Sequence, residues 1–267
     1  MPLSELSGSS RAIFSTSRWA VVLASDRSQN PDGPEALAKL CRTYWKPVLH
    51  FLRVRGHSGG ECQILLQDFF ANLLNPRAAS PADRPHGRFR TYLLASVQRF
   101  LYSLEPRPGG VTRDTQRVLL LFDPPTPLEM DRELTAVTES EPAAAFDTAW
   151  ARTVFDLALD RLQNEAEVRG RRNLLEELGM YLTGEFPDTD KVRLSAMSTR
   201  LGMSVPMVKI SISRLRQRFR AFVREEVAGT LARPGELDDE LQYLNLSRLL
   251  QEKPTPSMDA VTLDPAH

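Results

Sequence analysis

Residues 191–224 read KVRLSAMSTRLGMSVPMVKISISRLRQRFRAFVR, and no other stretch says more about the fold of this chain. The stretch holds nine Lys or Arg and no Asp or Glu, whereas the whole chain has a formal net charge of zero. Positive charge is therefore concentrated here. Solvated helices ordinarily mix both signs, so the absence of acidic residues sets this stretch apart. A local cationic surface of this kind indicates nucleic-acid binding.

The same stretch has the spacing of two helices joined by a short turn. Gly202 stands where the first helix would end, a place that favours a residue tolerant of positive φ. Ser204 is placed to cap the second helix, and Pro206 falls in its first turn, where a missing N–H costs nothing. Apolar residues that share a face are Leu194, Met197 and Leu201, then Val208, Ile212, Leu215 and Phe219. This pattern predicts a helix-turn-helix.

The other positions of the second helix are predicted to face outward, as they would in a DNA major groove. We expect Lys209 and Arg214 to contact bases, and Arg218, Arg220 and Arg224 only to attract phosphates. The full set of expected groove-facing residues is Ser204, Pro206, Met207, Lys209, Ser213, Arg214 and Arg216. The alternative is a solvated basic helix in an all-α core, because the same turn occurs in helical hairpins that never touch DNA.

Composition limits the class of protein. The chain has 267 residues, of which 42% are hydrophobic and 25% charged, as in an ordinary globular protein of one large or two small domains. We see no apolar run long enough for a bilayer and no cleavable signal. Two cysteines do not make a disulfide framework. These observations predict a cytoplasmic location.

Helical periodicity recurs along the chain and no convincing strand is present. The predicted fold class is all-α, with two helical domains joined by a long acidic, Pro-rich linker and a helix-turn-helix in the C-terminal domain. The linker has six prolines, eight acidic residues and four arginines. The expected boundaries are a flexible N-terminus at 1–15, a first domain at 16–104, the linker at 105–146, a second domain at 147–252 and a tail at 253–267.

Individual helices are expected at about 17–25, 34–55, 61–75 and 87–104 in the first domain. In the second domain they are expected at about 147–168 and 171–184. The two helices of the helix-turn-helix follow and continue to about 231, and a last helix is expected at about 236–251. Pro47 should bend or interrupt the helix of residues 34–55.

With these elements in order, the chain resembles an RNA polymerase sigma factor of the extracytoplasmic-function (ECF) group. The likeness covers roughly residues 14–250 and includes the long linker. It is carried by TSRWAVVLA at 16–24, LAKLCRTYWKPVLHFLRVRGHS at 37–58, LLQDFFANLL at 65–74, GRFRTYLLASVQRFL at 87–101 and LSAMSTRLGMSVPMVKISISRLRQRFR at 194–220.

The resemblance implies a role for each block. The first domain would bind the polymerase clamp through Gln67, Asp68, Phe69 and Phe70. It would capture the melted −10 element near Arg88, Arg90, Tyr92 and Arg99, because aromatic stacking and cationic grooves hold single strands. The second domain would bind the −35 element. The implied partners are core RNA polymerase, promoter DNA and an inhibitory anti-sigma protein, with no cofactor, no metal, no catalytic residue and no membrane insertion.

Within these stretches we expect Phe89 and at least one of Phe69 and Phe70 in the core. Arg88 and Arg90 are expected to be exposed, and Tyr92 either packs internally or faces the strand. The chain departs from the family at Ile64, where an acidic residue is usual, and at Leu66, where a small polar residue is usual. Residues 102–116 also lack the usual polar and basic run.

Two other classes remain open. An enzyme would need a catalytic constellation, and none stands out among the four histidines. A zinc site would have to use Cys41, His50, His57 and Cys62, whose spacing is not that of a usual site. A sigma-like DNA-binding regulator, or a module held by another protein without initiating transcription, is the second class. The altered stretch after Leu101 favours it.

Overall fold

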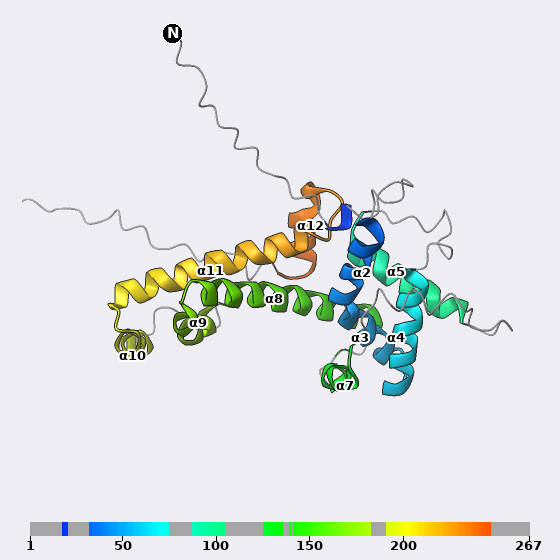
Figure 1. The fold of residues 1–267 in the computed structure, drawn as a ribbon, viewed down its shortest axis with the longest axis horizontal. Helices are drawn as coiled ribbons and strands as arrows, with labels where there is room; N and C mark the ends of the chain where they lie inside the picture. Colours follow the sequence, from blue (N-terminus) through cyan, green and yellow to red (C-terminus); the bar gives the residue numbers. More distant parts are fainter. Residues whose placement is uncertain are drawn as a thin grey trace, which may run out of the picture. The chain divides into compact units, whose positions relative to one another are not determined.

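The described part of the chain is helical throughout, as the sequence predicts (Figure 1). The structure is a computed structural model that describes residues 18–20, 32–74, 87–104, 125–135, 139, 141–182 and 191–246. Within these ranges there is no strand, only an isolated antiparallel bridge between Arg88 and Leu231. The expected tail and most of the expected N-terminus and of residues 105–126 lie outside the described residues.

The first helical residues described are 18–20, and ten α-helices and two 3₁₀ helices follow them in the described part of the chain. The α-helices are α2 (Asp32–Thr43), α3 (Trp45–Val54), α4 (Gly59–Leu73), α5 (Phe89–Ser103), α7 (Pro127–Thr135), α8 (Pro142–Val168), α9 (Arg172–Leu178), α10 (Lys191–Leu201), α11 (Val205–Ala228) and α12 (Leu237–Tyr243). Two short 3₁₀ helices are η2 (Gly179–Tyr181) and η3 (Pro234–Glu236).

The chain divides into two units. Unit 1 comprises Met1–Val154 and Glu225–Leu237, and unit 2 comprises Phe155–Arg224 and Asp238–His267. All three boundaries between them fall inside a helix, the first in α8, the second in α11 and the third in α12. Residues 141–154 and 225–237, which we expected in the linker and the second domain, therefore belong to unit 1 by their packing.

Aromatic residues from distant parts of the chain form the centre of unit 1. Tyr44 stacks on Trp150 with ring centroids 4.0 Å apart and planes 10° apart. Phe89 lies 5.0 Å from Trp19 and 5.8 Å from Trp150. All four side chains are fully buried, as is that of Phe146. Large rings that bury this much apolar area dominate core energetics, so this cluster joins α2–α3, α5 and α8.

The expected interruption by Pro47 is confirmed. Helix α2 ends at Thr43 and α3 begins at Trp45, while Tyr44 between them has a non-helical backbone (φ −112°, ψ 32°). Pro47 is the third residue of α3, in the first turn, where backbone N–H groups have no intrahelical acceptor. The break turns the single predicted helix into two.

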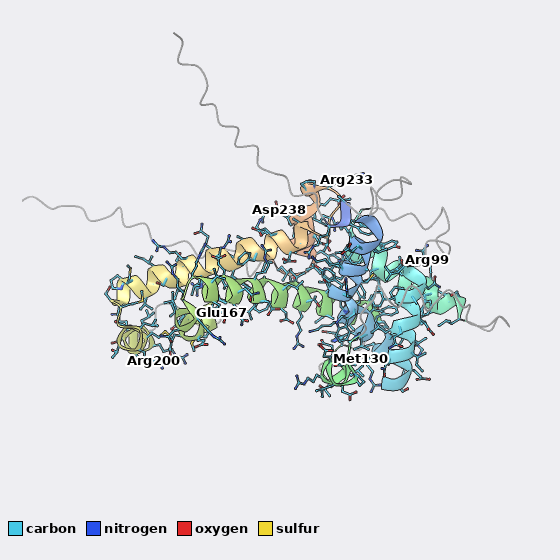
Figure 2. The ribbon with its side chains drawn as sticks, viewed as in Figure 1. Arg99, Met130, Glu167, Arg200, Arg233 and Asp238 are labelled. Atoms are coloured by element: carbon cyan, nitrogen blue, oxygen red, sulfur yellow. The ribbon has the colours of Figure 1, made fainter. Side chains whose placement is uncertain are left out.

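Residues 127–135, which lie within the expected linker, form a helix. A capping box starts it, since Glu129 Oε2 accepts from the Thr126 amide at 2.8 Å and Thr126 Oγ1 accepts from the Glu129 amide at 3.3 Å. Met130 is buried (Figure 2), and the Glu133 carboxylate contacts His50 Nε2 at 3.0 Å and Lys46 Nζ at 3.2 Å. These contacts hold α7 on α3 and α4.

The Glu133 contacts should make the stability of unit 1 sensitive to acid. The hydrogen bond from His50 lowers the pKa of Glu133 from 4.5 to about 2. A pKa lowered by folding gives stability that is present above the unfolded-state pKa and is lost as pH falls toward the folded-state value. We expect unit 1 to lose stability between about pH 4.5 and pH 2. Glu133→Gln should flatten that part of a urea-midpoint profile, whereas Glu35→Gln, at an exposed site, should leave it unchanged.

Candidate nucleic-acid interface

The hinge between α10 and α11 is a Schellman motif. The Met203 amide donates to the Ser198 carbonyl at 3.0 Å, and the Gly202 amide donates to the Thr199 carbonyl at 3.4 Å. Gly202 has φ +63°, in the left-handed region that glycine enters without a Cβ penalty. The Ser204 carbonyl then accepts the first bond of α11, from the Val208 amide at 3.0 Å. Gly202 and Ser204 therefore occupy the turn positions expected from the sequence.

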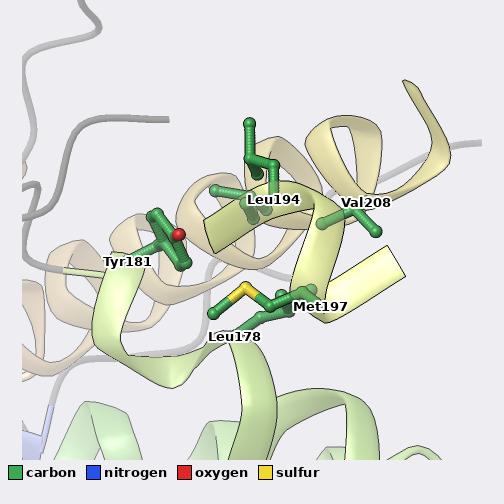
Figure 3. Packing of buried hydrophobic residues seen from close by; sticks show 6 residues of the cluster. Leu178, Tyr181, Leu194, Met197 and Val208 are labelled. Carbon is green, nitrogen blue, oxygen red and sulfur yellow. The ribbon is translucent and has the colours of Figure 1, made fainter. Parts of the chain in front are cut away.

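A small apolar core holds this helical pair in unit 2 (Figure 3). Leu194 and Met197 of α10 and Val208 and Ile212 of α11 are at most 2% exposed and pack with two residues from the preceding segment, Leu178 and Tyr181. The half-buried residues around them are Leu174, Leu201, Met203, Val205 and Leu215. The apolar stripe expected from the sequence is thus confirmed, and α11 has its orientation within unit 2 fixed by packing.

Burial of that stripe leaves the opposite side of α11 in solvent. Six of the seven expected groove-facing residues are exposed, namely Ser204, Pro206, Met207, Lys209, Ser213 and Arg214. Ile210 is also 44% exposed and lies three residues after Met207, so the two share a face with Arg214. We missed Ile210 from the sequence, because an isoleucine between two buried-stripe positions gives no signal of exposure. We call Met207, Lys209, Ile210, Ser213 and Arg214 the reading face.

Arg216 does not belong to this face, contrary to our expectation. Its side chain is half-buried, and its Nε donates to the Tyr181 carbonyl at 2.7 Å. Tyr181 closes the 3₁₀ turn η2 and is itself buried. The Arg216 guanidinium therefore links α11 to η2 in unit 2. Helical spacing alone predicted that Arg216 faces outward, but the 3₁₀ helix η2 packs against its side chain.

Several other bases of residues 191–224 are neutralised by acids from elsewhere in unit 2. Arg200 pairs with Glu177 at 2.9 Å, Arg218 with Glu165 at 2.6 Å and Arg224 with Asp238 at 3.0 Å. Lys209 and Arg214 have no such partner within the described residues. Paired charges largely cancel at a distance, so the positive electrostatic potential of α11 is centred on the reading face.

A groove of about 820 Å³ runs alongside the reading face, between the end of α8, the start of α9 and α11. Met207 and Arg214 line it together with Leu174, Arg169, Arg171 and Arg218. Four arginines against one acidic residue, Glu165, make its walls cationic. We did not predict Arg169 and Arg171 as DNA contacts from the sequence. The basic run VRGRR at 168–172 is the signal that could have identified them.

The expected clamp-binding residues of α4 separate into core and surface. Phe69 and Phe70 are buried, and Phe69 packs edge-on against Phe100 of α5 at 5.6 Å. Gln67 and Asp68 are half-buried and thus reachable from solvent. Ile64, one turn earlier, is 60% exposed. A complete capping box between Ser58 and Glu61 starts the helix and orients this surface.

The four residues expected at the melted strand behave differently from one another. Arg90 is buried, contrary to expectation, and its Nη1 donates to Asp147 Oδ1 at 2.7 Å. Tyr92 is half-buried against Trp19, and burial raises its pKa to about 12. Arg88 is also half-buried, with Nε 3.7 Å from Glu236 Oε2. Arg99 is exposed (Figure 2), three residues before Tyr102, an aromatic side chain that is 67% exposed.

The candidate zinc ligands do not gather. Cys41 and Cys62 are buried thiols, and burial raises the pKa of Cys62 to about 11. His50 is bonded to Glu133 instead. In the described ranges, no three His, Cys, Asp or Glu side chains are placed to share a metal ion.

Comparison of the chain with protein-family models, with curated proteins and with solved structures finds no match. Among the described helices, none combines the length and the apolar character needed to cross a bilayer.

Proposed function

We propose that this protein is a non-enzymatic specificity subunit of RNA polymerase, a sigma factor of the ECF type. The observation that carries the proposal is the reading face of α11. Lys209 and Arg214 are exposed there, without an ion-pair partner among the described residues, on a helix held by the Leu194, Met197, Val208 and Ile212 core. An exposed helix with apolar and cationic side chains at its N-terminal half suits insertion into a DNA major groove.

Four residues of the reading face have a chemical role in this proposal. The Arg214 guanidinium and the Lys209 ammonium donate to guanine O6 and N7, the commonest specific contact in the major groove. Met207 and Ile210 offer exposed apolar surface to thymine methyl groups. Arg171 in the adjoining groove attracts backbone phosphates, which positions the helix without reading sequence.

Unit 1 supplies the polymerase and single-strand contacts in this proposal. Gln67 and Asp68, with Ile64 beside them, form the surface offered to polymerase. Arg99 and Tyr102 are the cation and aromatic ring that are exposed for an opened −10 strand. A base stacked on an aromatic side chain gains about 1–3 kcal/mol, largely regardless of sequence.

Reconstitution with core polymerase and a promoter library, followed by transcript sequencing, tests initiation. We then expect Lys209→Ala and Arg214→Ala each to weaken binding of the selected −35 duplex by about 1–3 kcal/mol, measured by fluorescence anisotropy at fixed salt. Lys191→Ala with Arg193→Ala is the matched control, because it also removes two exposed positive charges, on α10. Equal losses in this control and in the double variant Lys209→Ala with Arg214→Ala would mean that α11 contributes charge alone and would contradict its reading role.

A second candidate is a sigma-like DNA-binding regulator that does not initiate transcription. The observation in its favour is that Arg90 is buried and Arg88 faces Glu236, so two of the four residues expected at a melted strand are engaged inside unit 1. Affinity for core polymerase separates the two candidates. Promoter binding that neither requires nor is improved by core polymerase would favour the regulator.

A further inference from the structure

The segment that follows α11 is paired with the start of α5 inside unit 1. The Phe89 amide donates to the Thr230 carbonyl at 2.9 Å, and the Ala232 amide donates to the Gly87 carbonyl at 3.2 Å. These two bonds flank the antiparallel bridge between Arg88 and Leu231. Residues 229–236, which we call the clasp, therefore lie along Gly87, Arg88 and Phe89 by backbone pairing.

A second set of contacts fastens the beginning of the clasp. The Trp19 amide donates to the Gly229 carbonyl at 3.1 Å, and Trp19 Nε1 donates to the Gly87 carbonyl at 2.7 Å. Arg18 pairs with Glu226, in the last turn of α11. A Cβ at Gly229 would lie 3.0 Å from the Arg18 guanidinium, so the close approach there favours glycine. Three separate stretches of unit 1 thus meet at this point.

Side-chain burial supports the pairing. Thr230 is 1% exposed and Leu231 2% exposed, although both lie in a segment without regular secondary structure. Burial of the Leu231 side chain removes apolar surface from water, which stabilises the docked position of this segment. The clasp is therefore docked by its apolar residue as well as by its backbone.

The outer end of the clasp places a carboxylate at Arg88. Glu236 Oε2 lies 3.7 Å from Arg88 Nε, which is within ion-pair range but too long for a hydrogen bond. The same oxygen is buried and has no hydrogen-bond partner among the described residues. A buried carboxylate oxygen without a hydrogen bond is costly, so this end of the clasp is held more weakly than the Trp19 end.

We infer that the clasp is an autoinhibitory contact, in which Glu236 occupies the position that a strand phosphate would take at Arg88. The inference rests on the proposed function in one respect, namely that unit 1 binds single-stranded DNA, and it adds Arg88 as a strand contact that is covered in the closed form. A strand reaches Arg88 only after residues 229–236 detach from 87–89. If the open form is about a tenth of the population, the apparent affinity for the strand is about tenfold weaker than that of the open form.

The main test compares Leu231→Asn with Leu128→Asn in the full chain. Leu231 is buried in the clasp, whereas Leu128 is 63% exposed on α7, so the same chemical change acts at a docked and an undocked site. The probe is a fluorescent single-stranded DNA of mixed sequence. We expect Leu231→Asn to bind it about tenfold more tightly than the unaltered protein does, and Leu128→Asn to bind it equally.

A readout that does not involve DNA reports clasp opening itself. Amide hydrogen exchange at Phe89 and Ala232 should be about tenfold slower in the unaltered protein than in an unprotected amide, and should approach the unprotected rate in Leu231→Asn. If Leu231→Asn does not fold, Glu236→Gln tests the same contact without changing an apolar residue, against Glu35→Gln as an exposed control of equal charge. We expect a several-fold gain in single-strand affinity for Glu236→Gln alone. Arg88→Ala should abolish the gain in either background.

The outcomes are distinguishable. Faster amide exchange without a gain in single-strand affinity would overturn the inhibitory role, and so would fast exchange of both amides in the unaltered protein. A gain that survives Arg88→Ala would also overturn it. A gain that requires Arg88 supports the clasp even if the protein fails to direct transcription with core polymerase, and that failure would count against the proposed function alone.

Discussion

Trp150→Ala is expected to lower the free energy of unfolding of unit 1 by about 3–5 kcal/mol, the usual cost of removing a large buried aromatic side chain. Trp150 is fully buried and contacts Tyr44, Phe89 and Phe146 at once. Its removal leaves a cavity between α2–α3, α5 and α8 that a rigid aromatic cluster does not refill. Urea unfolding followed by circular dichroism measures the change.

Two variants serve as controls for this prediction, one within the aromatic stack and one at an exposed ring. Tyr44 Oη and Trp150 Nε1 are buried, and neither has a hydrogen-bond partner among the described residues. Tyr44→Phe should therefore leave stability unchanged or raise it, because no protein hydrogen bond is lost. Tyr102→Ala, at a ring that is 67% exposed, should change stability by less than about 0.5 kcal/mol. A large loss in Tyr44→Phe would show that the Tyr44 hydroxyl makes a stabilising hydrogen bond and would contradict its environment as described.

Asp147→Ala is expected to destabilise unit 1 by a comparable amount, about 3–5 kcal/mol, because it takes the carboxylate from a buried guanidinium. The Arg90 side chain is 7% exposed and donates to Asp147 at 2.7 Å. Loss of one member of a buried ion pair costs more than loss of both, since the remaining charge stays desolvated. Chemical denaturation of Asp147→Ala, Arg90→Met and the double variant gives the coupling between the two residues.

The same variants decide whether Arg90 has any role at DNA. We expect the double variant Arg90→Met and Asp147→Ala to be more stable than Asp147→Ala alone and to bind single-stranded DNA as well as the unaltered protein does. Equal binding follows if Arg90 only joins α5 to α8. A folded double variant that loses single-strand binding would show that Arg90 reaches the strand after all.

Most helix positions follow from local chemistry that a sequence displays. Gly202 ends α10 because the left-handed conformation needs glycine, and Pro47 marks the break before α3 because proline has no N–H to donate. Neither feature needs a distant residue. The apolar positions of α10 and α11 were likewise predictable, because a helix with period 3.6 brings Val208 and Ile212 to one side whatever lies opposite.

The failures concern residues whose partners lie far away along the chain. Arg90 was expected in solvent, yet it is buried because Asp147, 57 positions later, supplies its counter-charge. Arg216 was expected on the reading face, yet it donates to the carbonyl of Tyr181, 35 positions earlier. The helix at 127–135 within the linker could not be read from the sequence either, because Glu133 contacts His50 and Lys46, which lie far away on α3.

For this protein, the amino-acid sequence by itself determined the all-α class, the main helices and the cationic stretch with its turn. These depend on backbone conformation, hydrophobic period and composition, which act within a few residues. Only the tertiary structure decided which arginines remain exposed and that residues 229–236 pair with 87–89. Exposure and ion pairing depend on what packs against a side chain, and a helical period specifies the direction of a side chain without specifying its neighbour.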